Sequence, residues 1–286
     1  MNDDKIQNQL IYSTVRIKSY NNQGFAIGTG FFVMKEYDND IVRVVLVTNK
    51  HVVEKYDRAE IIVCEADDKG NPVDNKHVVI NIPDLQAMCR FHPDADVDLC
   101  FLMIGDVNNY LKAIKSRAYF KCIGLDFFIS DEEIKVLTAI ENVVMIGYPL
   151  GLMDDANNKP VVRKGITATS IALDYNGKKE FMIDMACFPG SSGSPVFLEK
   201  AGLLQTPRED GKGSRVGVNY WYKLLGVVYA VPQMTVKGDI KAEEVPTTAK
   251  IYSESKGFIN LAYVIKAERI KELFEVIEQS EKNGGK

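Results

Sequence analysis

One short segment, FPGSSGSPVF at residues 188–197, combines a serine with the glycines that could expose it for chemistry. Taken alone, such a cluster is most often an ordinary turn, but strand-like residues both enter and leave this one. Glycine permits backbone angles and close approaches that a Cβ would forbid. In a tight turn of this kind, the N–H groups of Gly190 and Ser192 could point together at a developing oxyanion, usually the largest electrostatic contribution in acyl transfer. Ser192 is therefore the candidate nucleophile.

A serine hydroxyl needs a neighbouring base, and the chain has three histidines. The pentapeptide NKHVV occurs twice and supplies two of them, His51 and His77. His51 follows the apolar run IVRVVLVT, so it is predicted to emerge at the end of a core strand that can aim it. His77 follows a turn and is predicted to begin an ordinary strand with its ring toward solvent. His92 lies in FHPDAD, where no predicted strand fixes it, so His51 is the candidate base.

The base must in turn be oriented by an acid. The segment DADVDLCFLMI supplies Asp94, Asp96 and Asp98 just ahead of a predicted buried strand. Asp98 borders that strand directly. It is therefore the aspartate that we expect to be held beside the imidazole.

The elements that would position these residues are mostly strands. Apolar runs rich in Val, Ile and Phe, bounded by Gly, Asn, Asp and Pro, predict an all-β sandwich or barrel protein. The runs cover residues 13–17, 25–34, 41–48, 77–82, 97–104, 143–148, 165–173, 181–188, 194–197 and 224–231. The clearest helical pattern is KAERIKELFEVIEQ, which places Ile270, Leu273, Phe274 and Ile277 on one face. We expect this helix to pack on the body; binding of a partner is the alternative.

Composition restricts the class of protein. The chain has 286 residues, 46% of them hydrophobic, and its 35 basic and 39 acidic residues give a net charge of −4. No basic stripe with interleaved aromatic residues suits nucleic acid, and no apolar run is long enough for a signal peptide or a membrane span. We therefore expect a cytoplasmic protein with no nucleic-acid or membrane partner. The five cysteines lack a CxxC pair and indicate buried thiols rather than disulfides or a zinc site: Cys64, Cys89, Cys100, Cys122 and Cys187.

These segments, in this order, resemble the trypsin-like fold, and within it the bacterial branch that includes the HtrA/Deg peptidases. The resemblance rests on GTGFFV, VLVTNKHVV, DLCFLMI and DMACFPGSSGSPV, supported by IGYPLG, KGITATSI, LLGVVYA and INLAYVIKAERI, and it covers about residues 12–275. It implies an all-β protein of two six-stranded antiparallel β-barrels with a C-terminal α-helix. The first barrel would span residues 1–125, the second 126–264 and the helix 265–281, with no PDZ-like domain.

The resemblance also implies roles for single residues. His51 would be the base, Asp98 the acid and Ser192 the nucleophile, with Gly190 and Ser192 forming the oxyanion hole and no metal or organic cofactor. An extended polypeptide substrate would pair with an edge strand, and its side chain before the scissile bond would enter a pocket based near Ala186. Because alanine offers no charge for Lys or Arg, a small or apolar side chain is predicted there. The expected edge strand consists of Val227, Val228, Tyr229 and Ala230.

The chain departs from the family pattern at several positions. Ser191 and Ser194 stand where relatives often carry Asn or Asp and Gly, which predicts a looser oxyanion turn. The N-terminal segment and the acid needed for activation by cleavage do not appear in this sequence, so that mode of activation is not expected. Residues 199–222 and 232–257 are polar and are interpreted as inserted loops bordering the substrate cleft.

Three other classes of function make different demands on the sequence. An α/β-hydrolase would carry G-x-S-x-G with its histidine after the serine, whereas all three histidines here precede Ser192. A metallohydrolase would need HExxH or clustered ligands that three scattered histidines do not supply. The alternative that stays open is a catalytically weak or inactive module that keeps the fold and binds peptides or a regulatory protein partner.

Overall fold

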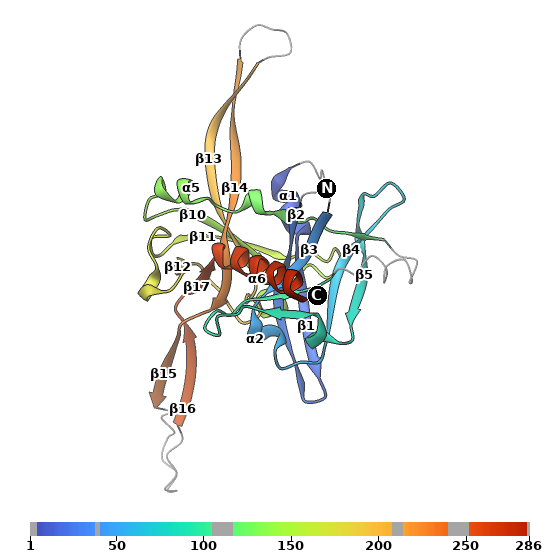
Figure 1. The fold of residues 1–286 in the computed structure, drawn as a ribbon. Coiled ribbons are helices and arrows are strands. Elements are labelled where there is room, and N and C mark those ends of the chain that lie inside the picture. The colour runs from blue at the N-terminus through green and yellow to red at the C-terminus, as the bar shows by residue number, and fades with distance from the viewer. Residues whose placement is uncertain (1–4, 38–40, 105–116, 208–213, 240–251, 285–286) are drawn as a thin grey trace.

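The structure is a computed structural model that describes residues 5–37, 41–104, 117–207, 214–239 and 252–284. Strands dominate it, and two β-structures follow each other along the chain (Figure 1). The first is a nine-stranded sheet and the second is a closed six-stranded barrel. A helix at the C-terminal end packs on both.

In the first sheet the strand order is β5-β4-β1-β2-β3-β7-β6, with β8 paired to β4 and β9 paired in parallel to β2. Side chains alternate across it, so that Ala59, Ile61 and Val63 of β4 are buried, as a half-buried strand requires. The strands are β1 (Thr14–Asn21), β2 (Gly24–Tyr37), β3 (Ile41–Thr48), β4 (Arg58–Ala66), β5 (Pro72–Ile82), β6 (Cys89–Phe91), β7 (Cys100–Leu102), β8 (Ala118–Tyr119) and β9 (Ile123–Gly124). The helices of this half are α1 (Ile6–Tyr12), α2 (Lys50–Val53) and α3 (Leu85–Met88).

The second β-structure is an antiparallel barrel whose strands close in the order β10-β11-β12-β17-β14-β13. Its interior is filled by apolar side chains such as Met145, Phe181 and Val228, all of which are buried. The strands are β10 (Asn142–Gly147), β11 (Val161–Thr167), β12 (Glu180–Asp184), β13 (Pro195–Pro207), β14 (Ser214–Ala230) and β17 (Leu261–Lys266). Short helices lie between strands: η1 (Leu125–Phe127), α5 (Asp131–Lys135), η2 (Pro149–Gly151) and η3 (Tyr175–Gly177).

Two hairpins project from the barrel in opposite directions (Figure 1). The outer parts of β13 and β14 pair from Glu199 opposite Tyr222 to Pro207 opposite Ser214, and β15 (Gln233–Asp239) pairs with β16 (Tyr252–Phe258). The two polar insertions, interpreted from the sequence as loops, are therefore hairpins; residues 208–213 and 240–251 lie outside the described part. Polarity misled that interpretation, because a projecting hairpin satisfies its backbone without needing a buried face.

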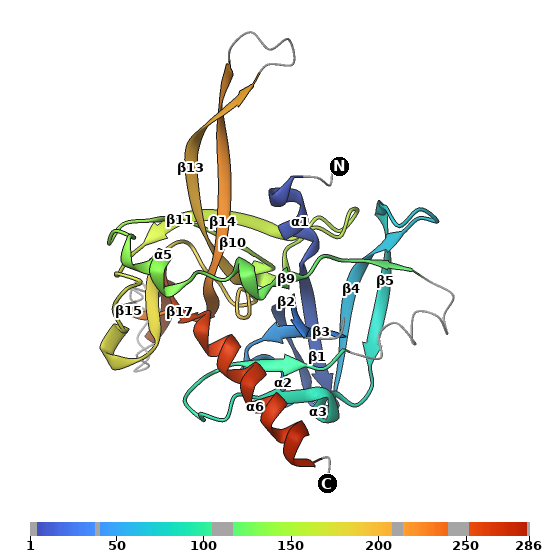
Figure 2. The same ribbon diagram turned by 45° about the horizontal axis from the view of Figure 1, so that its top comes forward.

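Helix α6 (Glu268–Gly284) runs from the barrel along the first sheet (Figure 2). All four residues of its predicted apolar face are buried, in a cluster that also contains Phe101 of the first sheet and Phe197 of the barrel. The rings of Phe274 and Phe101 lie 4.7 Å apart. Near its end, Glu278 accepts a hydrogen bond from Tyr37 at 2.7 Å. The helix thus covers the seam between the two β-structures.

The expected all-β trypsin-like architecture with a C-terminal helix is confirmed, although the first sheet has nine strands rather than six. Sequence reasoning missed α1 and β4, and the expected strand at 165–173 ends at Thr167. The proposed division at residues 125/126 and 264/265 stays a prediction. None of the helices in the described part of the chain is long and apolar enough to cross a lipid bilayer.

Truncation of the α6 anchor should destabilise the whole protein. Phe274→Ala removes a fully buried ring from the seam, and such changes lower the free energy of unfolding by about 3–5 kcal/mol. Urea denaturation measures the loss. The matched control is Val276→Ala, because Val276 is partly exposed on the same helix and should change stability by only about 0.5 kcal/mol. Equal effects of the two changes would contradict a buried role for this face.

Candidate active site

His51 and Asp98 are brought together by the pairing of two core strands. Thr48, at the end of β3, lies opposite Cys100, at the start of β7. His51 follows Thr48 by three residues, and Asp98 precedes Cys100 by two. Asp98 Oδ1 accepts the backbone N–H of His51 at 2.9 Å, and its Oδ2 lies 2.5 Å from the ring Nδ1. If Nδ1 carries the proton of that contact, Nε2 is left with a lone pair that can accept a proton.

The acid is fixed from the protein side, whereas the ring opens to solvent. The side chain of Asn49, which is fully buried, donates to the backbone oxygen of Asp98 at 2.7 Å. The neighbours of Asp98, Val97 and Leu99, are both buried. The Asp98 side chain is 22% exposed, whereas that of His51 is 46% exposed. A ligand can therefore reach the imidazole without disturbing its carboxylate.

The other histidines and aspartates have different environments. His77 lies exposed in β5, opposite Cys64. The expectation that His92 is unfixed is wrong, because its side chain is only 2% exposed and lies directly after β6. The loop that carries it folds back on itself, with the Asp96 N–H bonded to Asp94 Oδ1 at 3.1 Å.

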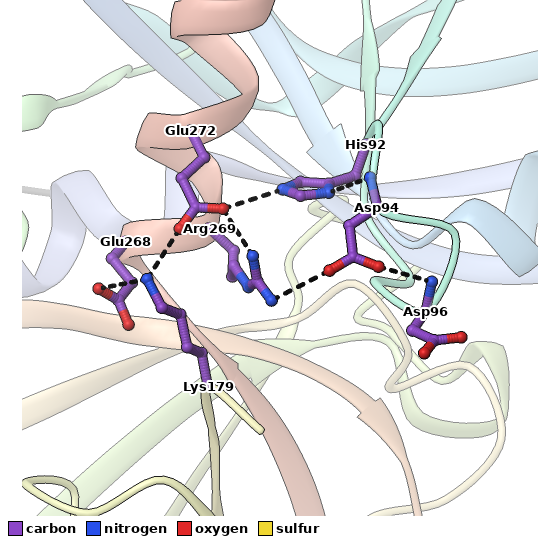
Figure 3. A network of polar contacts seen from close by, with 7 residues as sticks. All are labelled: His92, Asp94, Asp96, Lys179, Glu268, Arg269 and Glu272. Atoms are coloured by element: carbon purple, nitrogen blue, oxygen red, sulfur yellow. Dashed lines mark hydrogen bonds and ion pairs between the residues drawn. The ribbon is translucent and has the colours of Figure 1, made fainter. Parts of the chain in front are cut away.

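This loop is tied to helix α6 by a network of polar contacts (Figure 3). His92 Nδ1 accepts the N–H of Asp94 at 3.1 Å, and His92 Nε2 lies 3.5 Å from Glu272 Oε2. Arg269 joins the same network, 3.2 Å from Asp94 and 2.7 Å from Glu272. Lys179 adds a contact to Glu272 at 3.0 Å. These residues therefore hold the loop that leads to Asp98. They do not take part in the contact between Asp98 and His51.

The segment with Ser192 is a turn between β12 and β13 that requires glycine at two positions. Gly190 and Gly193 have φ angles of +93° and +88°, in the left-handed region. A Cβ on Gly190 would lie 2.5 Å from the Tyr148 oxygen, and one on Gly193 would overlap the Thr29 oxygen. Glycine is thus needed for both backbone angle and space.

Ser191, where relatives often carry Asn or Asp, adds contacts within this turn. Its N–H donates to the oxygen of Phe188 at 2.9 Å, and its Oγ accepts the N–H of Phe188 at 3.3 Å. Ser194 is also buried, and its Oγ has no hydrogen-bond partner within the described residues. Ser191 therefore closes the turn instead of loosening it.

Two backbone amides of the turn are left for a ligand. Neither the N–H of Gly190 nor that of Ser192 has an acceptor in the part of the chain that the structure describes. The peptide plane of Gly190 is nevertheless fixed, because the preceding carbonyl, that of Pro189, accepts the N–H of Leu150 at 2.6 Å. Gly190 is buried and Ser192 half-buried, and amides in such surroundings seldom lack a partner, so this pair indicates a site for an oxygen acceptor.

Thr29 of β2 joins the first sheet to this turn. Its N–H donates to the Ser192 oxygen at 2.8 Å, and its hydroxyl donates to the Gly190 oxygen at 2.9 Å. The same hydroxyl accepts the N–H of Tyr148 at 3.0 Å, and the Thr29 oxygen accepts the hydroxyl of Thr48 at 2.8 Å. Sequence reasoning missed this residue, although it lies in the GTGFF segment that carried the resemblance. Its signal was a buried hydroxyl between two glycines.

The turn that carries Ser192 and the helix that carries His51 contact neighbouring residues of β2, although no hydrogen bond joins Ser192 to His51 among the described residues. Gly28 packs against Val52, where a Cβ would be 2.6 Å from the valine side chain, and Thr29 binds the Ser192 backbone. The Ser192 hydroxyl lies 3.5 Å from the carbonyl oxygen of Tyr229. The structure thus places the turn that carries Ser192 and helix α2, which carries His51, against adjacent positions of one strand.

The expected edge strand needs a correction at its first two residues. Val227 is paired with Pro195 on one side and Ile265 on the other. Val228 bonds to Gly193 and Ser194 opposite its pairing with β17, so neither residue can add a peptide strand. A free edge can begin only at Tyr229, which is half-buried, as are Ala230 and Ala186.

Burial raises the pKa of four of the five thiols, those of Cys64, Cys100, Cys122 and Cys187, which makes them poor candidate nucleophiles. All five cysteines are free, and burial raises the pKa of Cys122 to about 11. Such a thiol stays protonated at neutral pH and is a poor nucleophile. In the described residues, no group of three or more His, Cys, Asp and Glu side chains is placed to hold a metal ion.

Comparison with known proteins found one matching family and several similar solved structures. The family described as "Trypsin-like peptidase domain" matches residues 28–204, more than half of the chain. No curated protein matches the sequence. Similar solved structures include a serine endoprotease from Yersinia pestis, with 16% identity, 98% of this chain and 68% of that chain covered, and a TM-score of 0.48. Another is a mutant of the tobacco etch virus protease, with 9% identity, 96% of this chain and 80% of that chain covered, and a TM-score of 0.46. A third is the thermostable serine protease AL20 from an extremophilic microorganism, with 11% identity, 94% of this chain and 98% of that chain covered, and a TM-score of 0.46.

Removal of the Thr29 hydroxyl should weaken the joint between sheet and turn. Thr29→Val keeps the volume but leaves the Tyr148 N–H and the Gly190 oxygen without their partner. Leaving a buried polar group unpaired lowers the free energy of unfolding by about 1–3 kcal/mol. Thr29→Ser keeps the hydroxyl and is the matched control. If urea denaturation showed the valine variant to be no less stable than the serine variant, the hydroxyl would not be the joint.

His92 should make stability depend on pH. Burial and the charge of Arg269 lower the pKa of His92 below its ordinary value of about 6.5, although Glu272 opposes the shift. Below that pH the unfolded chain binds a proton that the folded His92 resists, so the free energy of unfolding falls as pH decreases from 7 toward 5. His92→Gln should make this decrease shallower in urea denaturation. An unchanged pH dependence would rule out His92 as its source.

Proposed function

The chain belongs to the trypsin-like peptidase family, and from that premise we propose that it is a serine endopeptidase acting through Ser192, His51 and Asp98 with an acyl-enzyme intermediate. The observation that carries the proposal is the two-point contact of Asp98 with His51, to the backbone N–H and to ring Nδ1. A carboxylate held in this way fixes the ring orientation and favours the imidazolium form. Such an arrangement serves a base that must accept and return a proton.

In the proposed reaction, the Ser192 hydroxyl attacks the carbonyl carbon of a peptide bond while His51 Nε2 accepts the hydroxyl proton. The oxygen that becomes negative is received by the unpaired N–H groups of Gly190 and Ser192. His51 then protonates the leaving amine, and the C–N bond breaks. Water attacks the resulting ester by the same steps, which releases the acid and restores the serine.

The proposed substrate is an extended polypeptide. In this proposal the Tyr229 carbonyl, which lies 3.5 Å from the Ser192 hydroxyl, would accept the N–H of the residue before the scissile bond. Tyr229 and Ala230 would then form the edge to which the peptide pairs by strand addition. The side chain of the substrate residue before the scissile bond would enter a pocket based near Ala186. Ala186 brings no negative charge to that pocket, so cleavage after Lys or Arg is not expected.

One observation favours a second candidate function. The Ser192 hydroxyl contacts Tyr229 and has no hydrogen bond to His51 among the described residues. A protein that kept this arrangement would bind extended peptides on the same edge without cleaving them. A regulatory protein partner that brings serine and histidine together would convert the second function into the first.

The proposal includes a reducing location such as the cytoplasm. It is supported by the five free cysteines, four of which are buried. An unregulated peptidase in the cytoplasm would cleave the cell's own proteins. For this reason the proposed function includes a regulatory protein partner.

A fluorophosphonate probe tests the proposed nucleophile. The wild-type protein should be labelled, and Ser192→Ala should abolish both labelling and cleavage of casein while leaving the fold intact. Asp98→Asn should lower kcat by about 10⁴-fold, because the ring of His51 would adopt the wrong tautomer. His77→Ala is the matched control, because His77 has the same NKHVV context but lies exposed in β5.

Equal losses from His51→Ala and His77→Ala would overturn the assignment of the base. Labelling of the Ser192→Ala protein at the wild-type level would overturn the nucleophile. Wild-type labelling that appears only after addition of cell lysate would support the regulatory partner, whereas binding of peptides without any labelling would favour the second function.

A further inference from the structure

Arg163 of β11 is a half-buried cation without a counter-ion among the described residues. Its Nε is buried and has no hydrogen-bond partner, and no carboxylate in that part of the chain forms an ion pair with its guanidinium. The next residue, Lys164, instead contacts Glu199. A charged group removed from water is unfavourable unless it is paired. Arg163 is therefore a position at which an anion would be stabilised.

The strand register places Arg163 against the segment that leads to Ser192. Arg163 lies directly opposite Met145, so both side chains emerge on the same face, and the Met145 sulfur lies 3.7 Å from the sulfur of Cys187. The guanidinium lies over the ring of Phe188, 5.2 Å from its centroid. Ala186, the expected base of the substrate pocket, is the residue immediately before Cys187.

The charge of Arg163 acts on this segment. Burial raises the pKa of Cys187 to about 12, and the Arg163 guanidinium opposes that shift. The contact with Phe188 also holds the guanidinium in place, because a cation is attracted to the face of an aromatic ring. A fixed guanidinium presents its donors in a planar fork that matches a carboxylate.

A substrate held at Ser192 would direct one side chain toward this position. In the proposed complex, the N–H groups of Gly190 and Ser192 hold the oxygen of the scissile carbonyl, and the Tyr229 carbonyl accepts the N–H of the substrate residue before the scissile bond. The side chain of that substrate residue would then lie between the end of β14 and the segment 184–188. Ala186, the expected base of the pocket, is half-buried and brings no charge of its own. The described contacts place the cation of Arg163 against this segment. Of the nearby carboxylates, Asp184 is exposed, and Glu180 already accepts the hydroxyl of Tyr229 at 2.9 Å.

We propose that Arg163 selects the side chain before the scissile bond, and that this side chain is a carboxylate, Asp or Glu. The proposal rests on the proposed peptidase function for the placement of the peptide. It replaces the sequence-based expectation of a small or apolar side chain, which considered Ala186 alone. Arg163 comes from another strand and could not be assigned to the pocket from the sequence.

The test uses decapeptides that differ only in the central residue, which is Glu, Gln, Leu or Lys. Cleavage before and after that residue is followed by mass spectrometry with the wild-type protein, and binding of the same peptides is measured with Ser192→Ala protein. The Glu peptide should be preferred over the Gln peptide by roughly 10- to 100-fold in both assays, because one charged hydrogen-bonded pair distinguishes them. Arg163→Gln should remove this preference, and Arg163→Glu should shift it to Lys. Lys164→Gln, one residue away and paired with Glu199, is the matched control and should keep it.

The two assays separate this proposal from the proposed function. If the wild-type protein neither cleaves nor reacts with fluorophosphonate, yet Ser192→Ala protein binds the Glu peptide better than the Gln peptide in an Arg163-dependent way, the peptidase assignment fails and the role of Arg163 stands. If Glu and Gln peptides are cleaved and bound equally, or if Arg163→Gln leaves their ratio unchanged, the role of Arg163 is overturned even in an active peptidase.

Discussion

Residues of two β-structures can form one site only if the relative position of the two structures is fixed, and the hydrogen bonds of Thr29 contribute that constraint. This residue of the first sheet holds the backbone of both Ser192 and Gly190 in the turn of the second β-structure. Its carbonyl is held in turn by Thr48, three residues before His51. Helix α6 adds an apolar cover over the same seam. The relative position of the two β-structures at the site therefore depends on one buried threonine and on the helix that covers their seam.

The groups at the centre of the site have one property in common: each is fixed by the fold but left with unused bonding capacity. Asp98 orients His51 and leaves Nε2 open, and the bond from Leu150 to Pro189 orients the free amide of Gly190. Arg163 is held over Phe188, and its buried Nε has no hydrogen-bond partner among the described residues. Unpaired polar groups destabilise a folded protein, so their presence at one place indicates that a ligand completes them.

Local patterns predicted the fold where burial leaves a periodic trace. The face of α6 with Phe274 and the core strand that ends at Thr48 are both as expected, because each is amphipathic or fully apolar over a sufficient length. The two hairpins were misread, since paired strands satisfy each other's backbone groups even in a polar sequence, and polar composition is typical of loops. Strand β4 was missed, although it alternates and is bounded by Asp57 and Asp67; the charged residues within it, such as Glu60 and Glu65, interrupt the apolar run.

The sequence by itself determined which side chains could do chemistry: a serine between glycines, a histidine at a strand end and an aspartate at the start of another strand. Only the tertiary structure decided how they are used. The pairing of β3 with β7 brings Asp98 to His51, 47 positions away in the sequence, and Thr29 bonds to a residue 161 positions away. Burial assigned His92 to the contact with α6, two-sided pairing excluded Val227 and Val228 from any free strand edge, and strand register placed Arg163 opposite Met145, beside the segment that leads to Ser192. These outcomes depend on long-range register and burial, because one sequence pattern is compatible with many pairings until the strands have packed.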